Sequence, residues 1–219
     1  MSKQRTVNSR RGTTRRRFLR DSVLAASGAT LGTLALHRSV HAAGEGTIKI
    51  GMIGAGGRCA GAAAESMQAS PDVKLVAICD LFEDRVKGAR EALQAAAPNQ
   101  VAVDDDHCFV GFDGYQKVIE SADAVMIACA SKFHPMYAEA AIRAGKHVFV
   151  EKPHAIDPVG VRRMAAACEL AKTKGLSILS GLQSRFDTGY QETVKRIHDG
   201  AIGNVVAMQS MFLRGPYRL

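Results

Sequence analysis

The sequence predicts an α/β protein built on a parallel sheet with helices on both faces. From residue 47 onward, short apolar runs alternate with longer amphipathic ones, a pattern typical of strands joined by crossover helices. The apolar runs are nearly continuous in Val, Ile and Ala, as in strands that are buried on both sides. With 219 residues, the chain can form one domain, or one domain and part of another.

Five apolar runs are expected to form strands, at residues 48–53, 74–79, 124–130, 147–150 and 176–180. Helices are expected between and after them, at about residues 58–68, 83–96, 115–121, 135–144 and 158–174. Pro135 and Pro158 suit the first turn of a helix, and Gly145 and Gly175 suit helix ends. The turn residues therefore agree with the hydrophobic periodicity.

The formal charge of +8 is concentrated at the N-terminus. Residues 1–43 hold nine Lys and Arg and a single acid, Asp21, whereas the rest of the chain holds 20 basic and 20 acidic residues. A neutral body has no electrostatic attraction to nucleic acid or to an anionic membrane. We expect neither partner for it.

Residues 14–20 (Thr-Arg-Arg-Arg-Phe-Leu-Arg) resemble the twin-arginine export motif. A modestly apolar run follows at 22–36, and residues 40–42 (Val-His-Ala) precede Ala43 as a small-residue cleavage site. We interpret residues 1–43 as a signal peptide, which implies the twin-arginine machinery as a partner and a periplasmic or otherwise exported protein. A basic arm that binds nucleic acid explains only the arginines, and an uncleaved membrane-tethered leader is a minor variant.

No metal site is expected. The five cysteines, at 59, 79, 108, 129 and 168, form no C-x-x-C pair. Cys79, Cys129 and Cys168 lie in apolar stretches typical of buried small side chains. The adjacent acids at 104–106 cannot converge on one ion from an extended loop, so we interpret them as a solvated turn.

A glycine-rich turn at residues 54–59 (Gly-Ala-Gly-Gly-Arg-Cys) directly follows the first strand. Gly54 permits a tight turn, and Gly56 and Gly57 let the backbone approach a pyrophosphate at the start of the next helix. The third position of the fingerprint is Cys59, which departs from the usual Gly or Ala. This placement after a strand and before a helix predicts a dinucleotide site.

Asp80 ends the second strand, where an acid can accept hydrogen bonds from the adenosine ribose and so favours NAD over NADP. It could instead be the N-cap of the following helix. Arg58 leaves NADP possible, because a guanidinium can hold a 2′-phosphate; it could also bridge the pyrophosphate or lie in solvent.

Residues 144–153 (Ala-Gly-Lys-His-Val-Phe-Val-Glu-Lys-Pro) resemble the signature of the glucose-fructose oxidoreductase / inositol dehydrogenase / rhizopine-catabolism (Gfo/Idh/MocA) family. The resemblance extends over the body of the chain, since the glycine turn, Asp80, 123–125, His134 and 181–186 follow in the family's order. It implies a Rossmann-type doubly wound parallel sheet.

The resemblance assigns Lys152 a catalytic role beside the nicotinamide and the substrate hydroxyl. A lysine after a sheet strand lies in the ligand crevice, where its ammonium can stabilise a developing alkoxide. Most Lys-Pro pairs are only solvated loop residues, but the position of this one and its flanking match favour the catalytic role. Glu151 would orient Lys152 or contact the nicotinamide ribose.

The resemblance also places His134, next to Ser131, near the cofactor, although a lone histidine is more often a capping or packing residue. Gln183 and Arg185 fall where the family crosses into its second domain and approaches the nicotinamide. Arg185 could instead form a structural salt bridge.

We therefore expect a signal peptide at 1–43, an NAD(P)-binding domain at 46–182 and, at 183–219, the start of a truncated open-sheet α/β domain, with a helix near 188–198 and a strand at 205–212. The resemblance implies an exported NAD(P)-dependent oxidoreductase for a sugar, cyclitol or polyol, homo-oligomeric in its full-length form. An NAD-dependent glycoside hydrolase of the same superfamily and a non-catalytic dinucleotide-binding fragment are the alternatives.

Overall fold

The computed structural model describes residues 46–213. The predicted export leader at 1–43 lies outside this range. The chain divides after Gly46, and the compact unit from Thr47 onward holds every helix and strand described below. Within residues 46–213, no helix combines the length and the apolar character that a membrane span requires.

Six parallel strands form a single sheet in the order β3-β2-β1-β4-β5-β6. Their bounds are β1 Ile48–Ile53, β2 Val73–Asp80, β3 Cys108–Val110, β4 Ala124–Ile127, β5 His147–Val150 and β6 Ile178–Ser180. The chain moves outward to β3 on one side of β1 and then returns to β4 on the other side. This change of direction confirms the doubly wound Rossmann topology, in which a ligand crevice lies at the carboxyl ends of the strands.

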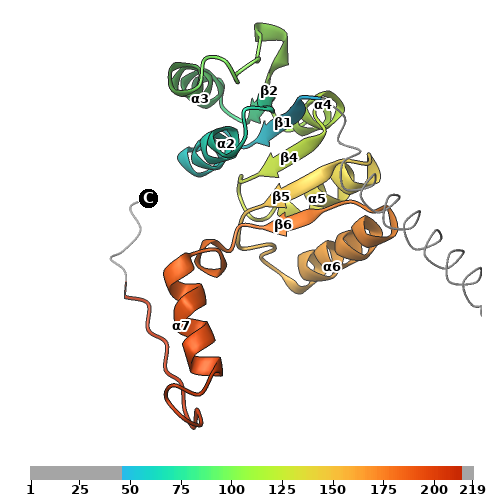
Figure 1. Cartoon of the computed structure of the whole chain (residues 1–219). Coiled ribbons are helices and arrows are strands. Elements are labelled where there is room, and N and C mark those ends of the chain that lie inside the picture. The colour runs from blue at the N-terminus through green and yellow to red at the C-terminus, as the bar shows by residue number, and fades with distance from the viewer. Residues whose placement is uncertain (1–45, 214–219) are drawn as a thin grey trace, which may run out of the picture. The chain divides into compact units, whose positions relative to one another are not determined.

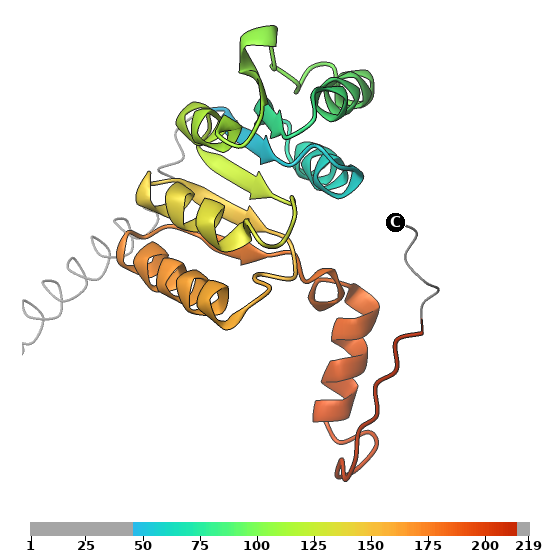
Figure 2. The ribbon, with the colours of Figure 1, turned by 180° about the vertical axis from the view of Figure 1, so that it is seen from behind.

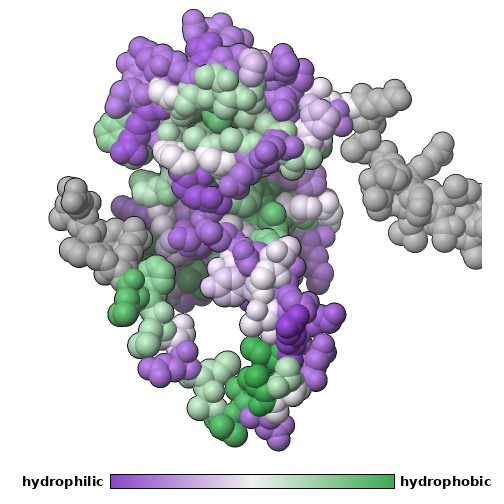
Figure 3. Space-filling view, turned by 60° about the vertical axis from the view of Figure 1, so that its left-hand side comes forward, coloured by the Kyte–Doolittle hydropathy of each residue, from purple (hydrophilic) through white to green (hydrophobic). Residues whose placement is uncertain are grey.

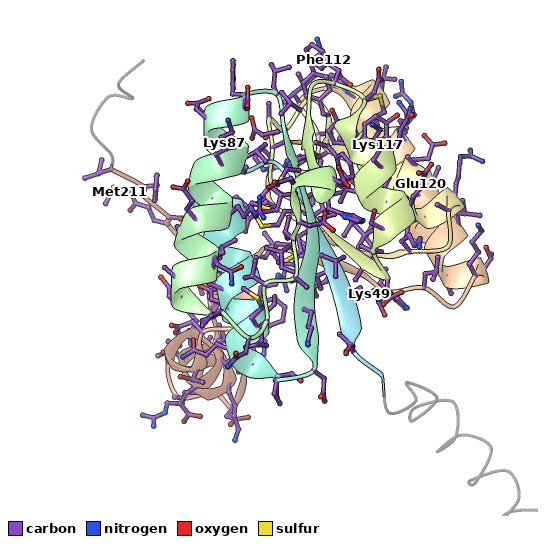
Figure 4. All side chains as sticks on the ribbon, turned by 90° about the horizontal axis from the view of Figure 1, so that it is seen from above. Lys49, Lys87, Phe112, Lys117, Glu120 and Met211 are labelled. Carbon is purple, nitrogen blue, oxygen red and sulfur yellow. The ribbon has the colours of Figure 1, made fainter. Side chains whose placement is uncertain are left out.

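Helices cover both faces of the sheet (Figure 1). On one face lie α2 (Gly57–Ala69) and α3 (Glu83–Ala96). On the other lie α4 (Gly114–Ser121), α5 (His134–Arg143) and α6 (Pro158–Thr173), of which α5 and α6 stand in front of the sheet in Figure 2. Figure 4 shows the same division, with Lys87 of α3 and Lys117 of α4 on opposite sides.

Each face of the sheet has its own apolar core. Met52, Leu75 and Ile78 are fully buried among residues that include those of α2 and α3, whereas Val125 and Ile127 pack with α4 and α5. The α4 helix approaches β1 closely, because a Cβ built on Gly51 would lie 2.5 Å from Val118 Cγ1. Burial of this kind stabilises by about 25 cal/mol per Å² of apolar surface.

The predicted helices are confirmed, and Pro135 and Pro158 do lie in first turns. Two strands are shorter than predicted. β4 ends at Ile127 rather than at 130, because the chain turns there to pack Cys129 against Gly54. β6 begins at Ile178 rather than at 176, because the Leu176 amide donates to Ala171 O at the end of α6.

The short strand β3 was not predicted, because its three residues are too few to show a hydrophobic pattern. The acidic segment before it forms the predicted turn. Asp104 caps the 3₁₀ turn η1 (Asp105–His107) by accepting the His107 N–H, at 3.0 Å from N to Oδ1, and Asp105 pairs with Arg90.

After β6, the chain forms the 3₁₀ turn η2 (Gln183–Arg185) and α7 (Thr188–His198), as predicted for 188–198. The prediction of a strand at 205–212 is wrong for this structure, which has no regular secondary structure there. Val206 and Met208 are more than 90% exposed, and hydrophobic surface gathers at the end of the molecule that holds α7 and this segment (Figure 3). An apolar run becomes a strand only where a neighbouring strand accepts and donates its backbone hydrogen bonds.

The burial of the cysteines differs from the prediction at Cys168. Cys79 is buried as predicted and Cys129 is partly buried, but Cys168 of α6 is exposed, so its predicted burial is wrong. Cys59 is fully buried, with its Sγ 3.6 Å from Met126 O. A thiol at the third fingerprint position is therefore accommodated between α2 and β4.

Candidate functional site

The candidate site lies along the edge of the sheet that is formed by the carboxyl ends of its strands, called the carboxyl edge below. Because all six strands are parallel, the segments that follow them meet at this edge. Phe112, which follows β3, and Lys49, at the start of β1, mark the opposite edges of the sheet in Figure 4. The glycine turn, Asp80, Lys152 and Gly181 all follow or end strands at the Phe112 edge.

The glycine turn requires glycine at its first position. Gly54 has φ +100°, and a Cβ there would lie 2.9 Å from Cys129 N and 3.0 Å from Ala128 O. A Cβ on Gly56 or Gly57 would meet nothing within 4 Å, so the turn is open at these two positions. Since α2 begins at Gly57, the positive end of the helix dipole faces the opening.

Asp80 links the end of β2 to the glycine turn. Its Oδ2 accepts the Ala55 N–H at an N–O distance of 2.7 Å, and its Oδ1 accepts the Phe82 N–H at 3.1 Å. The alternative role as N-cap of α3 does not hold, because the N-cap residue is Phe82 and no side chain caps this helix. Asp80 instead fixes the backbone that surrounds the first of two cavities.

This first cavity, the Asp80 cavity, has a volume of about 250 Å³ and lies between Gly54, Gly56 and Asp80. Its other walls are aromatic, apolar or thiol-bearing, and they include Phe82, Phe112, Tyr115, Cys129, Phe133 and Tyr137. Arg85, also in the lining, lies over the Phe82 ring at 5.5 Å. The sequence interpretation missed the aromatic side chains and Arg85, although Phe82 and Phe112 closely follow strand ends, where an aromatic residue can meet a ligand.

The aromatic wall is ordered by stacking. The rings of Phe133 and Tyr137 are nearly parallel with centroids 5.7 Å apart, and those of Tyr115 and Tyr137 are 4.4 Å apart. Burial raises the pKa of Tyr137 to about 12, so its phenol is neutral at physiological pH. The wall therefore offers flat, uncharged surfaces.

An ion pair joins the glycine turn to the loop after β5. Arg58 Nε lies 2.7 Å from Glu151 Oε1, and Glu151 is only 4% exposed. The hydrogen bond to Glu151 raises the pKa of Arg58. The other carboxylate oxygen accepts the backbone N–H of Lys152 at 3.2 Å, and the Lys152 side chain is exposed. Glu151 therefore fixes the backbone at Lys152.

Arg58 lines a second cavity and not the Asp80 cavity. This Arg58 cavity has a volume of about 560 Å³ and also includes Gln183, Ser184 and Gly181. The sequence interpretation allowed Arg58 to hold the 2′-phosphate of NADP, which would require it to lie near Asp80. The ion pair with Glu151 instead holds the guanidinium beside the loop that follows β5.

Gly181 and η2 complete this side of the site. A Cβ on Gly181 would overlap the Glu151 carboxylate, so glycine is required for Glu151 to lie where it does. Gln183 lines the Arg58 cavity. Arg185 does not line it: it lies along α7, and its carbonyl accepts the Gln191 side-chain N–H at 2.8 Å.

His134 is 1% exposed at the start of α5. Its Nδ1 lies 2.9 Å from Pro153 O, and its Nε2 lies 3.0 Å from Cys129 O. Burial lowers its pKa. Both ring nitrogens thus face backbone carbonyls, a geometry that favours the packing role over cofactor contact. Ser131 contributes its carbonyl, which accepts the His134 N–H at 3.3 Å.

A second histidine, His154, holds the loop that follows β5, and the sequence interpretation missed it. His154 Nε2 lies 2.6 Å from Ser180 Oγ at the end of β6. Three side chains, Glu151, His134 and His154, therefore hold the Lys152 loop (residues 151–154) against the glycine turn, the β4–α5 turn and β6.

Comparison with known proteins identifies the family. The model of an oxidoreductase family with an NAD-binding Rossmann fold (GFO_IDH_MocA) matches residues 48–179. The chain belongs to this family. The match contains the whole sheet up to β6, the glycine turn and the Lys152 loop.

Family members resemble the chain over less than half of their own length. Myo-inositol 2-dehydrogenase of Thermotoga maritima is 30% identical over 158 residues, 71% of this chain and 42% of the relative. A glycosyl hydrolase family 109 protein of Solibacter usitatus is 34% identical over 65% of this chain and 33% of the relative. The structure of scyllo-inositol dehydrogenase from Lactobacillus casei, with bound NAD(H) and scyllo-inositol, superposes with a TM-score of 0.54, at 26% identity, over 72% of this chain and 43% of that one.

NAD is the cofactor of this family, and the residues of the chain fit it. The backbone at Gly56 and Gly57 is open to a pyrophosphate, and no Cβ can replace the hydrogen of Gly54. The Asp80 cavity adjoins the turn on one side, and the Arg58–Glu151 pair adjoins it on the other.

Proposed function

We propose that this chain is the dinucleotide-binding part of an NAD-dependent oxidoreductase that acts on a cyclitol, sugar or related polyol. One observation carries the proposal: the Arg58–Glu151 pair joins the glycine turn directly to the loop of Lys152. A dinucleotide held on the turn would then end beside a lysine. The inositol dehydrogenases among the relatives support the substrate class.

The glycine turn and Asp80 would hold the dinucleotide, whose nicotinamide supplies hydride transfer when it is bound. Gly54, Gly56 and Gly57 let the backbone approach the pyrophosphate, and the N-terminus of α2 offers N–H donors to it. Asp80 uses one lone pair of each oxygen for Ala55 and Phe82. Its remaining lone pairs can accept the ribose hydroxyls, which favours NAD, with NADP as the second choice.

Lys152 would act on the substrate hydroxyl. Its ammonium can stabilise an alkoxide that develops as hydride leaves the carbon, and it can hold or return the hydroxyl proton. Glu151, buried and paired with Arg58, keeps the Lys152 backbone in place. Gln183, which lines the Arg58 cavity, is placed to border the substrate side.

Fluorescence titration of the purified chain with NADH and NADPH tests the binding part of this proposal. We expect saturable binding of NADH that Gly54→Val abolishes, with weaker binding of NADPH. In the full-length protein, Lys152→Met should bind NADH with little change but lose dehydrogenation of myo-inositol, measured as NADH formation at 340 nm. Absence of dinucleotide binding by the wild-type chain would refute the proposal, and unchanged turnover by Lys152→Met would remove the role of Lys152.

The family 109 glycosyl hydrolase relative supports a second candidate function, NAD-assisted glycoside cleavage. Release of p-nitrophenol from aryl glycosides without net NADH formation would select it. NADH formation from free polyols without glycoside cleavage would select the dehydrogenase. Dinucleotide binding with neither reaction would select a non-catalytic dinucleotide-binding role.

We also propose that residues 1–43 direct export through the twin-arginine pathway, on the basis of the motif at residues 14–20, in which Thr14 precedes Arg15 and Arg16, and of the Val-His-Ala cleavage site. Cell fractionation tests this. Replacement of Arg15 and Arg16 by lysine should retain the protein in the cytoplasm, and export that persists would argue against the motif. A homo-oligomer is proposed for the full-length protein, and light scattering tests it.

A further inference from the structure

His134 is built into the protein differently from a ligand-binding histidine. It is 1% exposed, and its two ring nitrogens lie 2.9 and 3.0 Å from two carbonyl oxygens that are far apart in the sequence. One carbonyl belongs to Cys129 in the turn after β4, and the other belongs to Pro153, the residue after Lys152. Neither ring nitrogen is left for a ligand.

We infer that His134 is a positioning residue that clamps the Lys152 loop to the turn after β4, through bridging contacts from its ring to Cys129 O and Pro153 O. The turn after β4 also limits the space at Gly54, because Cys129 N lies only 2.9 Å from the place that a Cβ on Gly54 would take. His134 thereby ties the Lys152 loop to the wall of the dinucleotide turn. The consequence for Lys152 rests on the proposed function; the clamp itself does not.

The chemistry of the ring explains why histidine suits this place. A neutral imidazole donates one hydrogen bond, to either carbonyl according to the tautomer, and an imidazolium donates two. Phenylalanine would fill a similar space without a donor, so the carbonyl that accepts from His134 would lose this hydrogen bond.

The other two anchors of the loop do not duplicate this contact. Glu151 binds the Lys152 backbone N–H and Arg58, on the side of α2. His154 binds Ser180 Oγ, on the side of β6. Only the contact of His134 holds the Pro153 carbonyl among the hydrogen bonds of residues 46–213.

Amide hydrogen exchange of the full chain, with and without NADH, tests the clamp. In His134→Phe, exchange at the Glu151 and Lys152 amides, which have acceptors in Ile127 O and the Glu151 carboxylate, should rise at least about 10-fold, a loss of about 1.4 kcal/mol of local protection. His134→Gln retains a side-chain N–H donor and should recover part of that protection. His147→Phe is the matched control: His147 begins β5, at the opposite edge of the sheet, and should leave the loop unchanged.

A long-range ¹H–¹⁵N spectrum of the wild-type imidazoles gives a readout that does not depend on any variant folding. A clamped His134 should carry a proton on Nδ1, which faces Pro153 O, or on both ring nitrogens, with slow exchange of that N–H. A ring protonated on Nε2 alone, or one that averages both tautomers and exchanges freely, would overturn the inference, as would His134→Phe with wild-type exchange in the loop.

Dinucleotide binding separates this inference from the proposed function. If the wild type binds NADH and loop exchange rises in His134→Phe, both stand. If loop exchange rises but the wild type binds no dinucleotide, the clamp stands and the proposed function fails. If the wild type binds NADH and loop exchange does not rise, the function stands and the clamp fails.

Discussion

The two cavities beside the glycine turn are built in different ways. The Asp80 cavity has aromatic and thiol walls, and its main polar group, Asp80, is bonded to backbone N–H groups only 25 and two residues away in the sequence. The Arg58 cavity is lined by one member of an ion pair, since Arg58 binds Glu151, 93 positions away in the sequence, and this carboxylate also depends on the absence of a side chain at Gly181. The Asp80 cavity is lined by the segments at and after the ends of β1 to β4, whereas the Arg58 cavity lies between α2 and residues of β5, β6 and η2.

We therefore expect substitutions beside the two cavities to affect different properties: cofactor affinity at the Asp80 cavity and the stability of the folded protein at the Arg58 cavity. Polar groups of the Asp80 cavity are satisfied by backbone whose course the sheet already fixes, so a change there should alter mainly the recognition of the ribose. A change in the Arg58 cavity leaves a buried carboxylate without its cation, which destabilises the folded state itself. The predictions below test that division, from the largest expected effect to the smallest.

Gly54→Val would disrupt the element that the two cavities share. The residue has φ +100°, and a Cβ would lie 2.9 Å from Cys129 N, so strain and overpacking should together lower the free energy of unfolding by about 3–5 kcal/mol. Urea denaturation measures this loss. Gly88→Ala is the control, since a Cβ there meets nothing within 4 Å and alanine should stabilise the exposed middle of α3 by about 0.5–1 kcal/mol. Equal stability of the two variants would contradict the assigned geometry.

Arg58→Met should lower the free energy of unfolding by about 1–3 kcal/mol, below the usual loss for a fully buried pair because the Arg58 side chain is 46% exposed. Glu151→Gln in the Arg58→Met background should restore most of this loss, since a neutral amide needs no cation. A double-mutant cycle in urea measures the coupling. Additive effects of the two changes would show that the pair contributes nothing to stability.

Asp80→Asn should change recognition more than stability. The amide oxygen can still accept one backbone N–H, but the loss of charge weakens acceptance from the ribose hydroxyls. We expect about 10-fold weaker NADH binding, equal to about 1.4 kcal/mol, and a smaller change for NADPH. Fluorescence titration with both dinucleotides measures the ratio. An unchanged preference for NADH over NADPH would show that another residue selects the cofactor. Arg85, which lines the same cavity, would then be the first residue to substitute.

His134 should produce a modest dependence of stability on pH. Burial lowers its pKa in the folded state below the unfolded value of about 6.5, so below that pH the unfolded chain binds the proton more readily. The stability associated with the neutral ring is present above about pH 6.5 and falls as pH decreases toward the folded pKa, by at most about 1.4 kcal/mol per pH unit. Urea midpoints of wild type and His134→Gln between pH 5 and 7.5 measure it; parallel curves would contradict the shift.

All strands except β3, and the helices between them, could be predicted from the sequence to within a few residues, because nearly continuous apolar runs between amphipathic helices form strands that are buried on both faces. The start of β6 could not, since Leu176 has the composition of a strand residue but its amide completes the end of α6. The predicted strand at 205–212 failed for the opposite reason: its composition suits a strand, but no neighbouring strand pairs with it among residues 46–213.

For the site, motif position predicted which residues gather at the carboxyl edge but not what each one contacts. Arg58 was assigned to phosphate or solvent and is bound to Glu151. His134 was placed by resemblance near the cofactor, and its ring instead bridges two carbonyls. Such pairings depend on which side chains face each other across strands, and sequence spacing does not encode that.

The sequence by itself determined the order of strands and helices, the glycine turn at the start of α2 and the lysine that follows β5. These features are local: each depends on periodicity, on glycine or proline at a turn, or on the residue that ends a strand. Tertiary structure alone decided that Glu151 pairs with Arg58, that Gly181 makes room for this carboxylate, and that His134 and His154 hold the Lys152 loop. A buried polar group must find its partner wherever packing brings one within about 3 Å, and only the folded sheet brings these segments together.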